Sequence, residues 1–146
     1  MSADDRPVTV LSEDECWSLL SSMSLGRLVT VLGGKPEIFP VNFVTQRRTV
    51  LFRTAHGTKL YSAVMGDWVA FEADYHDAPL TYGWSVIIKG RAQVLSANAD
   101  ILDAEEAPLR PWIATLKPIY VRVIAMEITG RRFKFGPEPD RESTCA

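Results

Sequence analysis

Residues 83–95 constrain the fold of this chain more than any other stretch, because polar and apolar side chains alternate along them. The apolar set is Trp84, Val86, Ile88, Ala92 and Val94, and the polar set is Ser85, Lys89, Arg91 and Gln93. Successive side chains of a β-strand point to opposite faces of its sheet. The pattern therefore predicts a long antiparallel strand with one face in the core and the other in contact with water.

The remaining patterns predict more strands and a few short helices. Ser12 and Glu15 have the spacing of a capping box, so a helix should begin at Ser12, and Gly26 should end it. Glycine and polar residues predict turns at 33–34 and 46–48. Further strands are expected at residues 27–32, 37–45, 49–54, 68–74 and 119–129, and further helices at 58–65 and 97–107.

These elements sum to a six-stranded meander without βαβ alternation, so the expected fold class is mainly β, a small antiparallel barrel with minor helices. With 146 residues, of which 47% are hydrophobic, the chain can form one domain with an adequate core. We expect this domain to span residues 1–135. Residues 136–146 are expected to form a disordered tail.

Charge and hydropathy argue against two classes of partner. Sixteen basic and eighteen acidic residues give a net charge of −2, which predicts no attraction to nucleic acid or to an anionic membrane surface. No apolar run approaches the roughly 20 residues that a membrane helix needs. The acidic N-terminal segment does not resemble a signal peptide, so a cytoplasmic protein is expected.

The turn after the 49–54 strand is a candidate anion site. Arg53, Thr54, Gly57, Thr58 and Lys59 lie where this strand leads into a short helix. Unpaired N–H groups at a helix start, together with basic side chains, suit a phosphate. An alternative stays open, in which Thr58 only caps the helix and the two basic side chains are solvated.

Several segments occur in an order that resembles a known family. They are GRLVTV, PVNFV, VLFRTAHGTKL, VAFEAD, GWSVIIKGRAQVL, PW and YVRVIAMEITGRRF. Over residues 25–133 they are similar to the pyridoxamine 5′-phosphate oxidase-like split-barrel family, in the branch that includes the nitroimidazole-resistance reductases. The resemblance implies a homodimer of six-stranded split barrels. It also implies flavin mononucleotide (FMN), or in some members a deazaflavin coenzyme, bound at the dimer interface.

The resemblance also implies cofactor-binding residues. Position by position, the family's phosphate turn falls on Arg53, Thr54, Thr58 and Lys59, its ring contacts on Val41 and Asn42, its residues from the other subunit on Trp84 and Ser85, and its ring cover on Trp112. For three of these residues a structural alternative stays open: the Asn42 amide satisfies a neighbouring loop, Trp84 is plain core, and Trp112 only pins a loop.

Two departures from the family pattern limit the expected chemistry. The oxidases proper carry a basic pair in the second strand and an arginine and a histidine near the C-terminus. Here IFPVNF has no basic residue, and the chain ends in RRFKF and the tail. Pyridoxal formation is therefore not expected.

Two functional hypotheses follow. One is a flavin-dependent oxidoreductase with an unknown substrate, and the other is a non-catalytic protein that binds or stores a flavin, a deazaflavin or haem. No cluster has the spacing of a metal site, and no nucleophile has a readable base beside it, so no catalytic residue is assigned. The role of His56 stays open.

Overall fold

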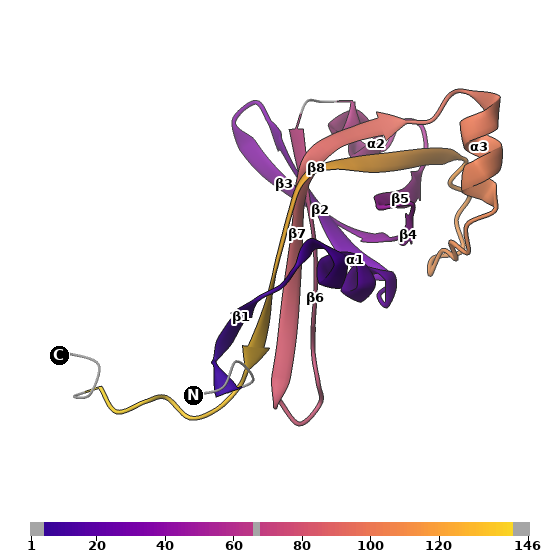
Figure 1. The fold of residues 1–146 in the computed structure, drawn as a ribbon. Coiled ribbons are helices and arrows are strands. Elements are labelled where there is room, and N and C mark those ends of the chain that lie inside the picture. Colours follow the sequence, from indigo (N-terminus) through magenta and orange to yellow (C-terminus); the bar gives the residue numbers. More distant parts are fainter. Residues whose placement is uncertain (1–4, 66–67, 142–146) are drawn as a thin grey trace.

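The computed structural model describes residues 5–65 and 68–141 and contains one eight-stranded sheet with short helices around it (Figure 1). Every helix in these residues is too short or too polar to span a bilayer. In chain order the elements are β1 (Val8–Val10), α1 (Glu13–Ser21), β2 (Leu25–Leu32), β3 (Lys35–Asn42), β4 (Val44–Gln46), β5 (Thr49–Thr54), α2 (Lys59–Val64), β6 (Trp68–His76), β7 (Tyr82–Val94), α3 (Asn98–Glu105) and β8 (Ile119–Lys134).

The order of the strands explains why the sheet curls. The strands follow the order β3-β2-β6-β7-β8-β5-β4, and β1 pairs with β8. Because only Phe43 separates β3 from β4 in the chain, the two ends of this order have to approach one another. The buried Phe43 ring packs edge-on against Phe71 inside the curl, with 4.8 Å between ring centroids. The result is a curled antiparallel half-barrel, which confirms the predicted mainly β class.

The long antiparallel pair of β7 and β8 forms the long axis of the molecule (Figure 1). The register shifts between Lys89 and Gly90, where β8 has one residue more than β7. A Cβ on Gly90 would lie 1.9 Å from the Ile124 carbonyl oxygen, so only glycine permits this close approach. On either side of this shift β8 has a further partner. Its first residues pair with β5, and residues near its end pair with β1.

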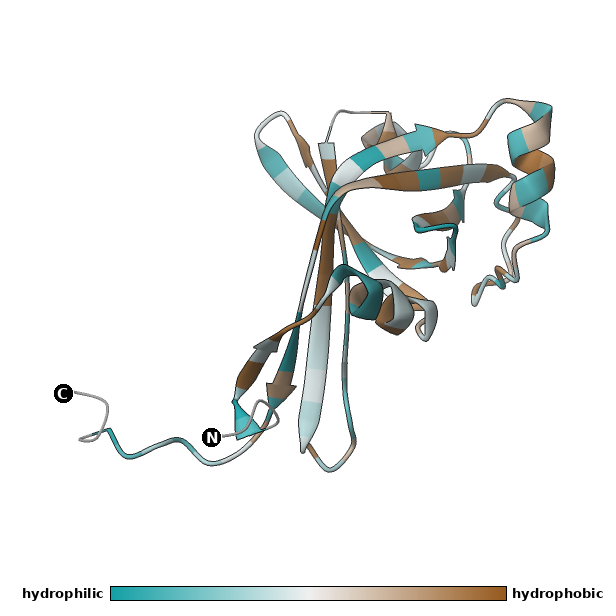
Figure 2. Ribbon diagram, viewed as in Figure 1, coloured by the Kyte–Doolittle hydropathy of each residue, from teal (hydrophilic) through white to brown (hydrophobic). Residues whose placement is uncertain are grey.

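The core confirms the alternation predicted for residues 83–95. Trp84, Val86 and Ile88 are buried, whereas Lys89 and Arg91 are exposed, and polar and apolar colours alternate over the end of β7 that leads to α3 in Figure 2. The α1 helix packs against β4, β7 and β8. Its predicted capping box is present, because the Ser12 hydroxyl accepts from the Glu15 N–H and the Glu15 carboxylate accepts from the Ser12 N–H.

The strand count and one helix end differ from the prediction. The expected 37–45 strand breaks at Phe43, because this side chain turns into the core, and β1 was not expected from its three residues. The first helix ends at Ser21, not at Gly26. Gly26 lies within β2, where a Cβ would come within 2.3 Å of the Phe71 ring. Both observations show that tertiary packing, not local propensity, sets these boundaries.

The last strand is longer than expected, because Gly130 does not interrupt it. A Cβ at this position would lie 2.6 Å from the Cys16 sulfur, so glycine lets α1 pack closely on β8. The expected turns are confirmed. Gly33 and Gly34 have positive φ, as do Arg47 and Arg48. Part of the predicted tail lies outside the described residues, and residues 136–140 form no helix or strand.

Candidate functional site

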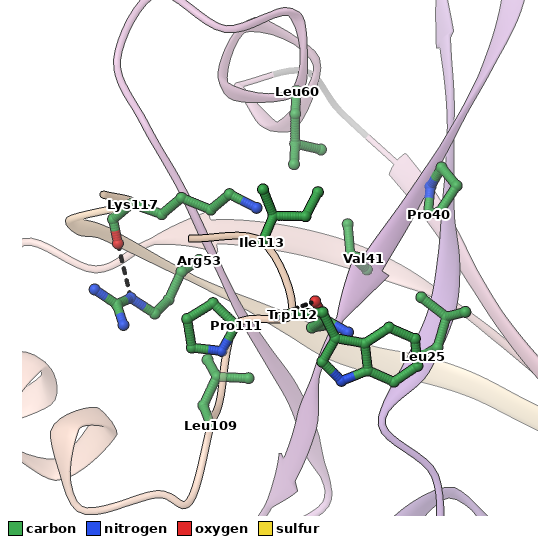
Figure 3. A pocket seen from close by; sticks show the side chains of 11 residues that line it. Leu25, Pro40, Val41, Arg53, Leu60, Leu109, Pro111, Trp112, Ile113 and Lys117 are labelled. Atoms are coloured by element: carbon green, nitrogen blue, oxygen red, sulfur yellow. Dashed lines mark hydrogen bonds between the residues drawn. The ribbon is translucent and has the colours of Figure 1, made fainter. Parts of the chain in front are cut away.

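A cavity of about 170 Å³ opens between β2, β3 and β5 and the loop that follows α3 (Figure 3). Its walls are mainly apolar. The residues that line it are Leu25, Pro40, Val41, Asn42, Arg53, Leu60, Leu109, Pro111, Trp112, Ile113 and Lys117. Four predicted cofactor residues are therefore brought together here, namely Val41, Asn42, Arg53 and Trp112.

Two cationic side chains line this apolar cavity. Antiparallel pairing sets Arg53 opposite Tyr120, and the Arg53 guanidinium lies 5.3 Å from the centroid of the Tyr120 ring. Arg53 Nε donates to the Lys117 carbonyl oxygen at 2.7 Å. Both side chains are half-buried, and neither forms an ion pair within the described residues. The cavity thus carries positive charge without a carboxylate to neutralise it.

Lys117 was not predicted as a site residue. In sequence it is one lysine in a proline-rich loop, two residues before the last strand. The pairing of Thr54 with Ile119 places this loop end beside Arg53. The register of β5 against β8 was the signal that could have located it, and composition alone does not supply that register.

The predicted phosphate turn divides into separate roles. Thr58 caps α2, because its hydroxyl accepts from the Tyr61 N–H at 3.0 Å and donates to the Ala55 carbonyl oxygen at 2.8 Å. Thr54 is buried and lies 3.0 Å from the Thr58 hydroxyl. Lys59 is exposed and pairs with Glu37. The capping alternative for Thr58 is confirmed, and phosphate binding by this turn stays a prediction.

Asn42 and Trp112 are joined to each other. The Asn42 side-chain oxygen accepts from the Trp112 backbone N–H at 3.1 Å, and the amide nitrogen donates to the Ser24 carbonyl oxygen at 3.4 Å. The Asn42 amide therefore satisfies a neighbouring loop, as the alternative reading expected. The Trp112 side chain remains 62% exposed at the cavity. Val41 is buried and lines the same cavity. Contacts of these three residues with a cofactor stay predictions.

Trp84 and Ser85 lie away from this cavity within one chain. Trp84 is a buried core residue opposite Tyr75, and Ser85 is half-buried opposite Asp74. The core alternative is confirmed for Trp84. The resemblance assigned both residues to a site completed by the other subunit, so their role there stays a prediction.

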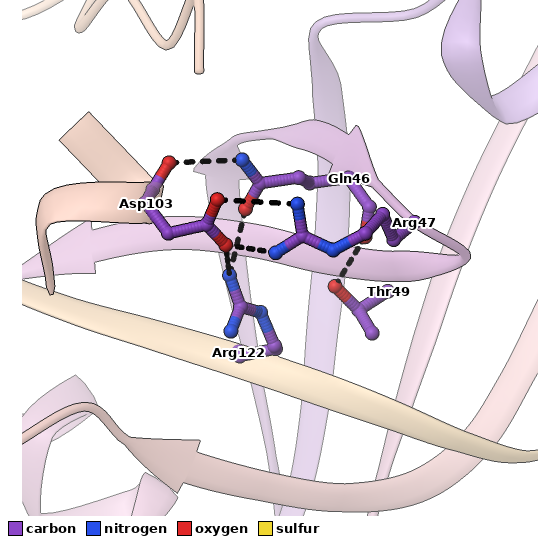
Figure 4. Close-up of polar contacts among 5 residues, drawn as sticks. All are labelled: Gln46, Arg47, Thr49, Asp103 and Arg122. Atoms are coloured by element: carbon purple, nitrogen blue, oxygen red, sulfur yellow. Dashed lines mark hydrogen bonds and ion pairs between the residues drawn. The ribbon is translucent and has the colours of Figure 1, made fainter. Parts of the chain in front are cut away.

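A polar network fixes the cover of the cavity (Figure 4). Asp103 of α3 pairs through its two carboxylate oxygens with Arg47, and its backbone oxygen accepts from Gln46 Nε2 at 3.0 Å. Arg122 of β8 donates to the Gln46 side-chain oxygen at 2.7 Å and lies 3.9 Å from the Asp103 carboxylate. The network attaches α3, and the loop that continues from it, to the β4–β5 hairpin.

A second charged cluster lies on the outer face of β2 and β6. Arg27 Nη1 lies 3.0 Å from the Glu72 carboxylate and 3.3 Å from the Asp74 carboxylate. Burial, together with the Asp74 hydrogen bond and charge, raises the pKa of Glu72 to about 7, against the lowering effect of Arg27. The Glu72 hydrogen bond lowers the pKa of Asp74. The two carboxyl groups therefore titrate as a coupled pair, in which Glu72 keeps its proton to a higher pH than Asp74 does.

The cavity itself offers few groups for proton transfer. None of the residues that line it is a histidine, a cysteine or a carboxylate. Over the described part of the chain, no three His, Cys, Asp or Glu side chains gather closely enough to hold a metal ion. The lining instead supplies two cationic side chains, one amide and apolar surface.

Comparisons with known proteins agree with this architecture. A protein of Mycobacterium tuberculosis is 61% identical over 103 residues, which are 70% of this chain and 92% of that protein. The FAD binding protein of Mycobacterium smegmatis is 51% identical, with a TM-score of 0.78 over 87% of this chain and 99% of that chain.

A conserved protein of Corynebacterium diphtheriae is 38% identical, with a TM-score of 0.74 over 88% of this chain and 99% of that chain. The family model described as pyridoxamine 5′-phosphate oxidase matches residues 12–132, which is most of the sequence. The chain therefore belongs to the pyridoxamine 5′-phosphate oxidase-like family of split-barrel proteins.

Proposed function

We propose that this protein is a flavin-dependent oxidoreductase whose cofactor phosphate binds to Arg53 and Lys117. The observation that carries the proposal is this pair of half-buried cations, which lack an acidic partner in the described residues and line a mainly apolar cavity. A guanidinium can donate two parallel hydrogen bonds to phosphate oxygens, and an ammonium adds a compact charge. An apolar wall with a tryptophan suits an aromatic ring system.

The choice of cofactor rests on similarity and chemistry together. Binding of FAD by a relative that is 51% identical supports a flavin here. FMN, FAD and a phosphorylated deazaflavin all present a phosphate and a ring of the kind that this cavity suits. When bound, such a group supplies electron transfer, while Val41, Asn42 and Trp112 hold and shield the ring.

We further propose that two copies of the chain form the complete site. The cavity of about 170 Å³ is smaller than the roughly 300–1,000 Å³ usual for ligand pockets, so one chain would enclose only part of a flavin. Large apolar side chains around the cavity are exposed, including Trp112 at 62% and Leu116 at 82%. Exposed apolar surface of this kind is typical of a protein interface.

The test is the spectrum and mass of any chromophore that copurifies with the protein, followed by thermal melting with added FMN, FAD or a deazaflavin. Ligand at one hundred times its Kd stabilises a folded protein by about 2.7 kcal/mol, so a rise in melting temperature is expected. A colourless protein that none of these compounds stabilises would contradict flavin binding. A monomer in sedimentation experiments would contradict the shared site.

A second candidate is a flavin-binding or storage protein without catalysis. The absence of histidine, cysteine and carboxylate from the cavity lining favours it. The two candidates differ in turnover. The test compares bound with free flavin in two rates, reduction by a nicotinamide cofactor and reoxidation by an acceptor. If both rates are no faster for bound flavin than for free flavin, the storage function is supported over the enzyme.

A further inference from the structure

A second cavity, of about 320 Å³, lies between α3, the end of β7 and the start of β8. It has apolar walls and two aromatic rings, from His56 and Tyr120. Its remaining lining residues are Val94, Leu95, Ile101, Pro118 and Ile119. It shares no lining residue with the first cavity.

Arg53 connects the two cavities. Its side chain lines the first cavity, while its guanidinium lies 5.3 Å from the centre of the Tyr120 ring that lines the second. The chain itself passes from one to the other, because Lys117 lines the first cavity and Pro118 begins the wall of the second. Positive charge therefore stands between two apolar chambers.

We infer that the second cavity binds the adenine ring of FAD. This inference rests on the proposed flavin function. FAD has an aromatic ring at each end and a pyrophosphate between them, and this sequence of apolar, anionic and apolar parts matches the two cavities and the cations that separate them. Adenine stacks on aromatic side chains whatever the surrounding sequence.

The surroundings of the second cavity fit a base better than a second flavin ring. Two aromatic rings line this cavity, the exposed ring of His56 and the half-buried ring of Tyr120. The His56 ring lies 4.9 Å from the ring of Tyr61, which positions it. An imidazole can also exchange a hydrogen bond with a purine edge.

The test compares FAD with FMN by isothermal titration calorimetry on the full chain. Stacking of one base implies that FAD binds about tenfold or more tightly than FMN. Ile101→Trp fills the second cavity and should reduce the FAD affinity to that of FMN, while FMN affinity stays unchanged. Leu102→Trp is the matched control, since Leu102 lies on the same helix but is 63% exposed, and it should leave both affinities unchanged.

His56→Ala is a second variant that does not alter α3, and it should also weaken FAD binding selectively. If thermal melting shows that Ile101→Trp does not fold, His56→Ala alone tests whether adenine binds in the second cavity. Equal affinities for FAD and FMN in the unmodified protein, or FAD binding that neither variant changes, would overturn the inference and leave flavin binding intact. Absence of binding by both compounds would overturn the proposed function as well.

Discussion

Arg27 and Arg53 lie on strands of the same sheet but in opposite electrostatic surroundings. Arg27 faces two carboxylates, those of Glu72 and Asp74, at 3.0 and 3.3 Å. Arg53 faces the aromatic ring of Tyr120 and the backbone carbonyl oxygen of Lys117. The charge of the first arginine is matched within the fold, whereas that of the second is not. The contrast indicates that an arginine is available to a ligand when its own fold leaves it without an anion.

The contrast also separates two kinds of contribution. A matched cation such as Arg27 contributes to stability, modestly when it is partly exposed. Arg53 and Lys117 have no carboxylate partner in the described residues, so they gain no such contribution and keep their charges for an anion. The two arginines should therefore respond to substitution in different assays.

The largest effect is expected for Arg53→Glu. Loss of charge-assisted hydrogen bonds to phosphate, each worth about 1.5–3 kcal/mol, together with an added negative charge should weaken FMN binding by about a hundredfold or more. Titration calorimetry measures this directly. The matched control is Arg27→Gln, for which the Kd should stay within about twofold. Equal losses of FMN affinity in the two variants would contradict the contrast between Arg53 and Arg27.

The next effect is on stability, for Arg27→Ala. Two neighbouring carboxylates would lose their cation, and the free energy of unfolding at pH 7 should fall by about 1 kcal/mol. Urea unfolding measures it. Arg48→Ala removes an exposed ion pair with Asp14 and should lower the free energy of unfolding by less than Arg27→Ala does. A weakened FMN affinity with unchanged stability in Arg27→Ala would reverse the roles assigned here.

A smaller effect is expected at the cover of the cavity, for Asp103→Asn. The variant loses the pairs with Arg47 and Arg122, so α3 and the loop beyond it are held less firmly. FMN should dissociate about threefold faster, as measured by stopped-flow fluorescence. Asp100→Asn changes the same helix at a position that forms no ion pair within the described residues, and it should leave the dissociation rate unchanged.

The smallest effect is expected for Glu72→Gln, as a change in the slope of melting temperature against pH. The pKa of Glu72 is raised to about 7 from 4.5, so the folded state binds more protons than the unfolded state between these values. The contribution of Glu72 to the free energy of unfolding is fully present below pH 4.5 and is lost as pH rises through 7. The melting temperature of the unmodified protein should therefore fall more steeply over pH 5–7.5 than that of the variant. Identical slopes would show that Glu72 is already ionised in this window.

Patterns local in sequence predicted much of the fold. The alternation of residues 83–95, the Ser12 capping box and the Gly33-Gly34 turn depend on neighbouring residues, and all three are present. The break at Phe43 could not be read locally, because its apolar side chain fits a continuous strand as well as an inward turn. Its reason is the contact with Phe71, 28 positions further along the chain.

The candidate site was predicted less completely than the fold. Arg53, Val41, Asn42 and Trp112 line one cavity as the resemblance grouped them. Lys117 was missed because its position depends on the register of β5 against β8. The bond from Asn42 to Trp112 spans 70 positions in the chain, so no sequence period can reveal it.

The most direct test of the central claim compares FMN with riboflavin, which has the same ring and lacks the phosphate. The unmodified protein should bind FMN at least about a hundredfold more tightly, since two cations meet the phosphate. In the double variant Arg53→Gln, Lys117→Gln this difference should disappear, with riboflavin affinity nearly unchanged. If the unmodified protein binds both compounds equally, or if the double variant keeps the full preference for FMN, these cations do not hold the cofactor phosphate.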